Sequence, residues 1–263
     1  GYAHLKAKAY YRMGESQYQM GNYQAAITSF QQVTGKPFAG QEDSELAYAH
    51  FWTGESLYHL KQFAPAIEAL KKSLAHQPPQ ELLSGVYYRM GCAYEELGQR
   101  VEAYAAFQRA DATGSNSVVS DASAATFRLA QSLQQQGKYT QAIAKYESFL
   151  QSSPDHPLRD ETNYALGQSF YELRQYPQAA QAFQRVITQS QKPNLVESST
   201  IGLGNAYYNQ KKYPEAIKTY QQLISSYPRS ALLAEAHFWR GWAYFQQVEP
   251  FAKVKDETGK PLD

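Results

Sequence analysis

The residues of this chain best suited to chemistry are one cysteine, six histidines and a pair of adjacent glutamates. Cys92 could act as a nucleophile only beside a general base, and no such residue can be identified from the sequence. The histidines lack the HExxH pattern and any Cys/His spacing that would hold zinc. Glu95 and Glu96 could share acid–base work only in a closed pocket, and more simply form a solvated face. The sequence therefore predicts no catalytic residue, no metal site and no cofactor.

Two other patterns have structural explanations. Gly202 and Gly204 resemble part of a phosphate-binding loop, but they lie inside a predicted helix, whereas such a loop follows a strand. His50 and His237 occupy equivalent positions in two of the repeats described below. At that position we expect them to substitute for an aromatic side chain packed between helices, rather than to bind a metal.

The elements that position these residues follow a repeat marked by small residues. Its members recur at a nearly constant spacing, with alanine in the one place where glycine is missing: Gly14, Gly54, Gly91, Ala130, Gly167, Gly204 and Gly241. We call this the glycine position and count other residues from it. A nearly fixed period of roughly 40 residues is typical of a stacked array whose units cannot bury their apolar faces alone.

Two further positions keep their spacing from the glycine position in the first six repeats. Position +12 is always alanine: Ala26, Ala66, Ala103, Ala142, Ala179 and Ala216. Position +16 is always large: Phe30, Leu70, Phe107, Tyr146, Phe183 and Tyr220. Glycine inside a helix costs roughly 0.5–1 kcal/mol relative to alanine, so its recurrence predicts close approach of two helices. We expect each glycine to face the alanine at +12, with the large side chain at +16 beside them.

Each repeat contains two segments in which apolar residues recur at helical spacing, one on either side of a short polar turn. Gly21, Gly98 and Gly137 in these turns suit the left-handed residue that follows a helix, and Pro177 and Pro214 suit the first position of the next helix. Each repeat is therefore predicted to be a helix, a tight turn and an antiparallel helix.

These residues resemble the tetratricopeptide repeat (TPR) family. The family signature is matched by Leu203-Gly204-x2-Tyr207, Ala216-x3-Tyr220 and Pro228, and by Met90-Gly91-x2-Tyr94 with Ala103-x3-Phe107. The leading aromatic residue of the signature varies here, and the period is longer than the one usual in the family. The resemblance implies an all-α fold, a right-handed TPR superhelix (α-solenoid) of about six and a half helix-turn-helix repeats.

The repeat predicts a single array over residues 1–247. Its repeats are expected at about 1–36, 41–77, 79–113, 118–153, 156–191 and 193–228, with a half repeat at 229–247. Residues 248–263 are predicted to be a polar tail or the start of a continuing chain. A solenoid needs a polar cap, so the aromatic half repeat is an unfinished end. We expect the native chain to continue past Asp263 as part of a longer protein; the alternative is that this end docks on a partner or on a second copy.

Composition narrows the class of partner. The net charge is +1 and no Lys/Arg run exceeds a pair, which argues against binding to nucleic acid or to a membrane surface. No apolar run approaches the length of a membrane-spanning helix, so we expect no membrane insertion. The chain has a single cysteine, so an internal disulfide is excluded, and this count fits either a reducing or an oxidising compartment.

The long period and residues 227–245 resemble the TPR repeats of bacterial envelope proteins, such as the Tol–Pal coordinating periplasmic protein. That resemblance implies a periplasmic or envelope-associated location, with the cytoplasm as the alternative.

Positions −3, +1 and +4 of the first helices share one face, because they are spaced by four and three residues. In the TPR family the first helices line a groove, so we predict that a partner binds to Tyr11, Glu15, Tyr18, Phe51, Glu55, Tyr58, Tyr88, Cys92, Phe127, Gln131, Tyr164, Gln168, Tyr171, Asn205, Tyr208, Phe238 and Trp242. Tyrosine and tryptophan combine a large rigid contact area with a polar group. The alternative is that these aromatic residues pack between neighbouring repeats.

The resulting hypothesis is a non-enzymatic scaffold that binds a peptide or partner protein in an aromatic groove, in a bacterial envelope complex. Two alternatives stay open: a self-assembling structural module that uses the half repeat, and the regulatory arm of a larger enzyme. Arg12, Arg89 and Arg128 recur at position −2, and they either contact a partner's carboxylates or are surface charges over neighbouring helices.

Overall fold

The computed structural model describes residues 2–35, 42–113 and 122–248, and every regular element in these ranges is an α-helix. The predicted tail beyond Val248 lies outside the described residues. The thirteen helices are α1 (Tyr2–Gln19), α2 (Tyr23–Thr34), α3 (Asp43–His59), α4 (Phe63–Ala75), α5 (Gln80–Glu96), α6 (Arg100–Ala112), α7 (Ala122–Gln135), α8 (Tyr139–Ser152), α9 (Arg159–Glu172), α10 (Tyr176–Gln189), α11 (Pro193–Asn209), α12 (Tyr213–Ser226) and α13 (Leu233–Val248). The predicted all-α solenoid of helix pairs is confirmed.

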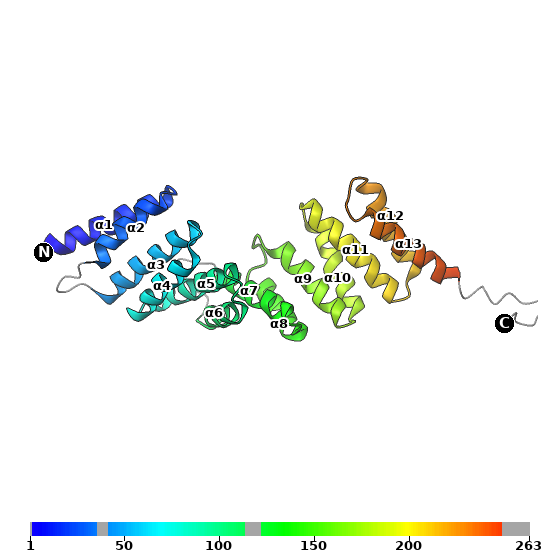
Figure 1. Cartoon of the computed structure of the whole chain (residues 1–263). Helices are drawn as coiled ribbons and strands as arrows, with labels where there is room; N and C mark the ends of the chain where they lie inside the picture. Colours follow the sequence, from blue (N-terminus) through cyan, green and yellow to red (C-terminus); the bar gives the residue numbers. More distant parts are fainter. Residues whose placement is uncertain (1, 36–41, 114–121, 249–263) are drawn as a thin grey trace, which may run out of the picture. The chain divides into compact units, whose positions relative to one another are not determined.

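The chain forms two compact units, and the division between Ser132 and Leu133 falls inside α7. In the first unit, each of α1 to α5 packs against the next helix in the chain; in the second, each of α8 to α12 does the same (Figure 1). The first helices of successive pairs also touch, since α3 contacts α1 and α5, and α11 contacts α9 and α13. Each pair thus buries its apolar surface against its neighbours.

Inside each pair, the large side chain at +16 lies directly against the glycine position. A Cβ atom added to Gly91 would lie 2.5 Å from Cε1 of Phe107, and one added to Gly204 would overlap the ring of Tyr220. Gly14, Gly54 and Gly167 have the same relation to Phe30, Leu70 and Phe183. The side chains at +16 are at most 2% exposed. They therefore occupy the space that a side chain at the glycine position would need.

This arrangement corrects one detail of the sequence prediction. The alanines at +12 are buried as expected, but they are not what chiefly faces the glycine. Only at Gly54 is an atom of the alanine at +12 among the nearest neighbours, with the carbonyl oxygen of Ala66 at 3.2 Å from the Cβ position. The side chain at +16 reaches back over the glycine because it projects from the second helix toward the first, and the small alanine at +12 leaves room for it.

The turns inside the pairs share a left-handed residue at position +7. Gly21, Gly98 and Gly137 have φ between 72° and 77°, as predicted. Three other turns place non-glycine residues there, Lys61, Arg174 and Lys211, with φ of 58° to 60°. A single left-handed non-glycine residue costs roughly 1–2 kcal/mol, so the turn geometry outweighs the residue preference. Pro177 and Pro214 lie within the first two residues of α10 and α12.

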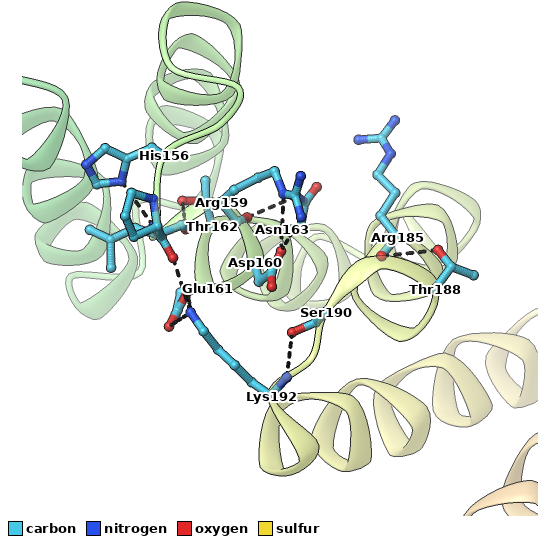
Figure 2. Close-up of polar contacts among 12 residues, drawn as sticks. His156, Arg159, Asp160, Glu161, Thr162, Asn163, Arg185, Thr188, Ser190 and Lys192 are labelled. Carbon is cyan, nitrogen blue, oxygen red and sulfur yellow. Dashed lines mark hydrogen bonds and ion pairs between the residues drawn. The ribbon is translucent and has the colours of Figure 1, made fainter.

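Polar contacts fix the connector between α10 and α11. Figure 2 shows Lys192, at the start of α11, reaching back to Glu161 in the first turn of α9. The Nζ atom lies 2.7 Å from Oε1 of Glu161 and donates to the backbone oxygen of Pro157 at 3.1 Å. The backbone N–H of Lys192 also donates to Oγ of Ser190 at 3.2 Å. Because these groups are largely exposed, the contacts orient the connector more than they stabilise it.

The two histidines at equivalent positions differ. The half-buried ring of His50 stacks on His76 with centroids 5.4 Å apart. Burial lowers the pKa of His50 to about 4, and the charges of His76 and Lys72 act in the same direction. His237 is instead exposed, with Arg240 nearby. The predicted packed role is correct for His50 and wrong for His237, because no helix in the described residues covers that side of α13.

The glycine position of α13 is also uncovered. Among the described residues, no heavy atom lies within 4 Å of a Cβ placed on Gly241, and the residue is exposed. The five glycines packed against a side chain at +16 and the uncovered Gly241 therefore provide a matched comparison within one chain.

We expect Gly91→Ala to destabilise the protein by about 1–3 kcal/mol, because the buried ring of Phe107 cannot move away from the added methyl group. Gly241→Ala should instead stabilise α13 by roughly 0.5–1 kcal/mol, the helix preference of alanine over glycine. Urea denaturation followed by circular dichroism measures both. Equal effects of the two substitutions would show that the contact at Gly91 is not tight.

Candidate functional site

The predicted groove residues lie on the first helices of the pairs: α1, α3, α5 and α7, and then α9, α11 and α13. We call the surface formed by positions −3, +1 and +4 of these helices the first-helix face of each unit. The two units are described separately below.

In the first unit, an internal network covers the first-helix face between α1 and α3. Trp52, at position −2, packs against the ring of Tyr18 with centroids 4.9 Å apart. Its Nε1 donates to the hydroxyl of Tyr11 at 3.1 Å. The hydroxyl of Tyr18 in turn lies 3.3 Å from Oε2 of Glu55 and 3.1 Å from Nε2 of His59. The predicted lining residues Tyr11 and Tyr18 are therefore already engaged by their own chain.

Arg89, at position −2 of the next repeat, closes the face between α3 and α5. Its Nε lies 2.5 Å from Oε1 of Glu55, and its guanidinium carbon lies 4.4 Å from the ring centre of Tyr58. The side chains of Arg89 and Glu55 are 20% and 7% exposed. Burial alone would lower the pKa of Arg89, but the charge of Glu55 and the hydrogen bond to it outweigh burial and raise the pKa.

The other two arginines of this series are also paired. Arg128 lies 3.7 Å from Oε2 of Glu95 and 3.4 Å from the side-chain oxygen of Gln131, and the exposed Arg12 lies 2.8 Å from Glu15. The carboxylates that these arginines contact therefore come from the chain itself.

Several predicted lining residues are buried. Phe51, Cys92 and Phe127 are at most 5% exposed. Burial raises the pKa of the Cys92 thiol, which favours its protonated form. Tyr88 is half-buried beside Phe107, with centroids 6.1 Å apart. For Phe51, Cys92 and Phe127, packing between helices leaves almost no surface that a partner could contact.

In the second unit, the first-helix face contains a pocket of about 290 Å³ between α9, α11 and α13. Four predicted residues line it: Tyr164, Gln168, Tyr171 and Asn205. The other lining residues are Glu172, Phe183, Ser198, Ile201, Gly202, Leu232 and Glu235, of which only Ile201, at position −3, lies on the predicted face. The pocket has aromatic walls, amide groups and two carboxylates.

Gly202 explains why a pocket exists here. It occupies position −2, where Trp52 and Arg89 close the face in the first unit. With no side chain at this position, the ring of Phe183 reaches the pocket, and a Cβ on Gly202 would lie 2.7 Å from it. The sequence contains a sign of this pocket, because position −2 changes from large residues to small ones. The small residues are Ala165 in α9 and Gly202 in α11.

The polar groups of the pocket are partly satisfied within the chain. The hydroxyl of Tyr164 accepts from Nε2 of Gln168 at 3.1 Å, and that of Tyr171 accepts from Nδ2 of Asn209 at 2.9 Å. Oδ1 of Asn205 accepts from the hydroxyl of Tyr220 at 2.7 Å. Burial is the main cause that raises the pKa of Tyr164 and Tyr171, so both hydroxyls stay neutral near pH 7.

The remaining predicted residues lie toward the end of the second unit. Tyr208 packs against Trp239, with centroids 5.6 Å apart. Phe238 and Trp242 on α13 are 57% and 40% exposed, and they form a shallow apolar surface with Phe245. These two are the most exposed aromatic residues of the predicted set.

The described residues contain no group of three or more His, Cys, Asp or Glu side chains that could hold a metal ion. Over the same part of the chain, none of the helices combines the length and apolar character needed to cross a membrane.

The Glu55–Arg89 pair leads to a stability prediction. Removing one member of a fully buried pair costs about 3–5 kcal/mol, and the partial exposure of Arg89 should reduce this to about 2–3 kcal/mol for Arg89→Met. Glu55→Gln/Arg89→Met should cost less than the sum of the single substitutions, because neither charge is then left unpaired. Urea denaturation measures this double-mutant cycle.

Arg12→Met is the matched control, since the exposed Arg12–Glu15 pair should contribute at most about 1 kcal/mol. Additive effects of Glu55→Gln and Arg89→Met would contradict the coupling that the geometry predicts.

Comparison with known proteins agrees with this architecture. Three family models, each described as a tetratricopeptide repeat, match residues 121–192; residues 11–81, 164–231 and 201–250; and residues 86–110. Among curated protein sequences, none is significantly similar to this chain.

Solved structures share the fold at low sequence identity. The C-terminal part of a TPR repeat-containing protein from Cytophaga hutchinsonii is 19% identical with a TM-score of 0.69, and the match covers 92% of this chain and 90% of that one. PilF from Pseudomonas aeruginosa is 18% identical with a TM-score of 0.62, over 89% of this chain and 98% of that one. YrrB, described as a TPR protein with an unusual peptide-binding site, is 16% identical with a TM-score of 0.57, over 72% of this chain and 89% of that one. With one family model matching more than half of its length, the chain belongs to the tetratricopeptide repeat family.

Proposed function

We propose that this protein is a non-enzymatic scaffold that binds an extended peptide segment of a partner protein on the first-helix face of its second unit. The observation that carries the proposal is the pocket around Gly202, which three successive first helices, α9, α11 and α13, build together. A site shared by three repeats suits an extended ligand, because such a ligand contacts several repeats at once.

The chemistry of the pocket supports a peptide ligand. Tyr164 and Tyr171 offer rigid aromatic surface of the kind that dominates protein interfaces. Nδ2 of Asn205 has no hydrogen-bond partner among the residues that the structure describes, so it is available to a peptide carbonyl. In the first unit, Trp52 and Arg89 lie on the tyrosines at position +4, whereas the glycine at position −2 leaves Tyr171 uncovered in the second unit.

The proposal assigns no catalytic role to these residues. The cysteine is buried and its raised pKa disfavours the nucleophilic thiolate. TPR domains are in general non-catalytic interaction modules, and the peptide-binding site named for YrrB is consistent with a similar use of this fold. The near-neutral net charge also favours a protein or peptide partner over nucleic acid.

The test is selection of binding peptides from a random library, followed by affinity measurement against variants. We expect Tyr171→Ala to weaken binding of the selected peptides by about 2 kcal/mol, roughly thirtyfold in Kd, because a central aromatic contact is lost. Fluorescence anisotropy measures the affinity, and a circular dichroism melt checks that the fold is retained. Tyr2→Ala, at a residue 83% exposed in the first unit, is the control. Equal affinities for all three proteins would exclude this face as the binding site.

A second candidate function, self-assembly, is favoured by α13. Phe238, Trp242 and Phe245 are 40–57% exposed, and the glycine position at Gly241 has no side chain packed on it within the described residues. In five other pairs an equivalent glycine is covered by a large apolar side chain. Another copy of the chain that packs a helix there would bury this apolar surface.

Self-assembly predicts that the mass in solution rises with protein concentration and that Trp242→Ser abolishes the rise. Sedimentation velocity of the wild type and the variant tests this. A monomer at every concentration would remove this candidate and leave the peptide-binding proposal unaffected.

We also propose a location in the bacterial envelope. Its support is the resemblance of the long repeat and of residues 227–245 to envelope TPR proteins. Fractionation of cells of the source organism tests it, and recovery of the protein only in the cytoplasmic fraction would contradict it.

A further inference from the structure

The first unit contains a contact between positions −2 and +4 that the pocket of the second unit lacks. Arg89, at position −2 of the third repeat, lies 4.4 Å from the ring centre of Tyr58, at position +4 of the second repeat. It also pairs with Glu55 at 2.5 Å. Aromatic surface and a carboxylate together hold this guanidinium in a site where it is largely removed from water.

The equivalent place in the second unit is the pocket. Tyr171 is at position +4 of the fifth repeat, as Tyr58 is of the second, and Gly202 is at position −2 of the sixth, as Arg89 is of the third. The tyrosine is therefore present, and the arginine that would lie on it is replaced by a residue with no side chain. Tyr164 adds a second, half-buried ring beside the space.

Gln168 corresponds to Glu55 at position +1, so the carboxylates of the pocket come from other positions. Glu172 and Glu235 line the pocket, no lysine or arginine does so, and neither glutamate forms an ion pair with the residues that the structure describes. Burial is the largest cause of the raised pKa values of Tyr164 and Tyr171, and the negative charge of Glu235 contributes in the same direction. The field of Glu235 therefore reaches the aromatic walls.

The partial charges of the helix ends do not cancel the negative charge of the pocket. The N-terminus of α13 contributes roughly half a positive charge, and the C-terminus of α9, where Glu172 lies, contributes roughly half a negative charge. These partial charges offset one another, so the charge of the pocket is set by its two carboxylates.

We propose that the pocket around Gly202 binds an arginine side chain of the partner peptide, which lies on the tyrosine at position +4 as Arg89 does in the first unit. The guanidinium lies against Tyr171 and pairs with Glu235, while Nδ2 of Asn205 donates to a peptide carbonyl. This inference rests on the proposed peptide-binding function and specifies the ligand side chain. The planar, permanently charged guanidinium fits aromatic walls and a carboxylate better than a lysine ammonium does.

The test is an NMR titration of the isotope-labelled full chain with N-acetyl-arginine amide, and with N-acetyl-citrulline amide as the uncharged isostere. We expect saturable shifts of the backbone amide signals of Tyr171, Gly202 and Asn205 with the arginine compound, and at least about tenfold weaker binding of the citrulline compound. Glu235→Gln should weaken binding of the arginine compound about fivefold to tenfold, and added salt should weaken it as well.

Glu235 also lies in the first turn of α13, where a carboxylate stabilises the helix, so a second variant is needed. Glu172→Gln, at the end of α9, should weaken binding in the same direction, and Glu147→Gln on the exposed surface of α8 should leave it unchanged. Melting curves identify any variant that is unfolded.

Equal binding of the arginine and citrulline compounds, or shifts confined to residues outside the pocket, would overturn the proposal. The library selection separates this failure from failure of the proposed function. Selected peptides that lose affinity with Tyr171→Ala but contain no arginine would leave the scaffold function standing and refute the arginine site. Selected peptides unaffected by Tyr171→Ala would refute both.

Discussion

The contact between a helical glycine and the large side chain at position +16 joins the two helices in five of the described pairs. Without a Cβ atom at Gly91 or Gly204, the ring of Phe107 or Tyr220 can lie directly against the first helix. Glycine destabilises the helix by roughly 0.5–1 kcal/mol at each of these positions. Burial of a large apolar side chain stabilises the fold by more than this cost. The spacing between the two residues cannot change, because they are on opposite helices of one pair. Variation in length is therefore confined to the connectors between pairs.

A second register, position −2 of the first helix, determines the surface that the repeats offer to a ligand. The glycine position and position +16 are buried inside each pair and set the fold, whereas position −2 meets the neighbouring repeat at its surface. Trp52 and Arg89 extend over the tyrosines at position +4 of the preceding repeat and cover them. Gly202 leaves the same space open. One framework can thus carry both a closed and an open face, and the difference depends on the size of one side chain per repeat.

The Glu55–Arg89 pair also shows why charge recurrence alone is a poor guide to binding. Three arginines at one register suggest a basic surface for an acidic partner. In the folded chain, each meets a carboxylate from its own or the preceding repeat. The Glu55–Arg89 pair is already largely desolvated and offers little to a partner, because a new contact would have to replace an existing one. The two carboxylates of the pocket have the opposite property, since neither is ion-paired within the described residues and each gains a counter-charge without losing one.

The sequence by itself determined the repeat period, the helix pairs, the positions of the left-handed glycines and the identity of the buried side chains at positions +12 and +16. These follow from local spacing, because helix periodicity and turn chemistry act over a short stretch of chain. It also placed Tyr164, Gln168, Tyr171 and Asn205 on one face. Only the tertiary structure decided that Phe51, Cys92 and Phe127 on the equivalent face are buried, that Arg89 is internally paired, and that Glu172 and Glu235 join the pocket. Those outcomes depend on which side chains of different repeats meet, and contacts between helices far apart in the chain cannot be read from the spacing within one repeat.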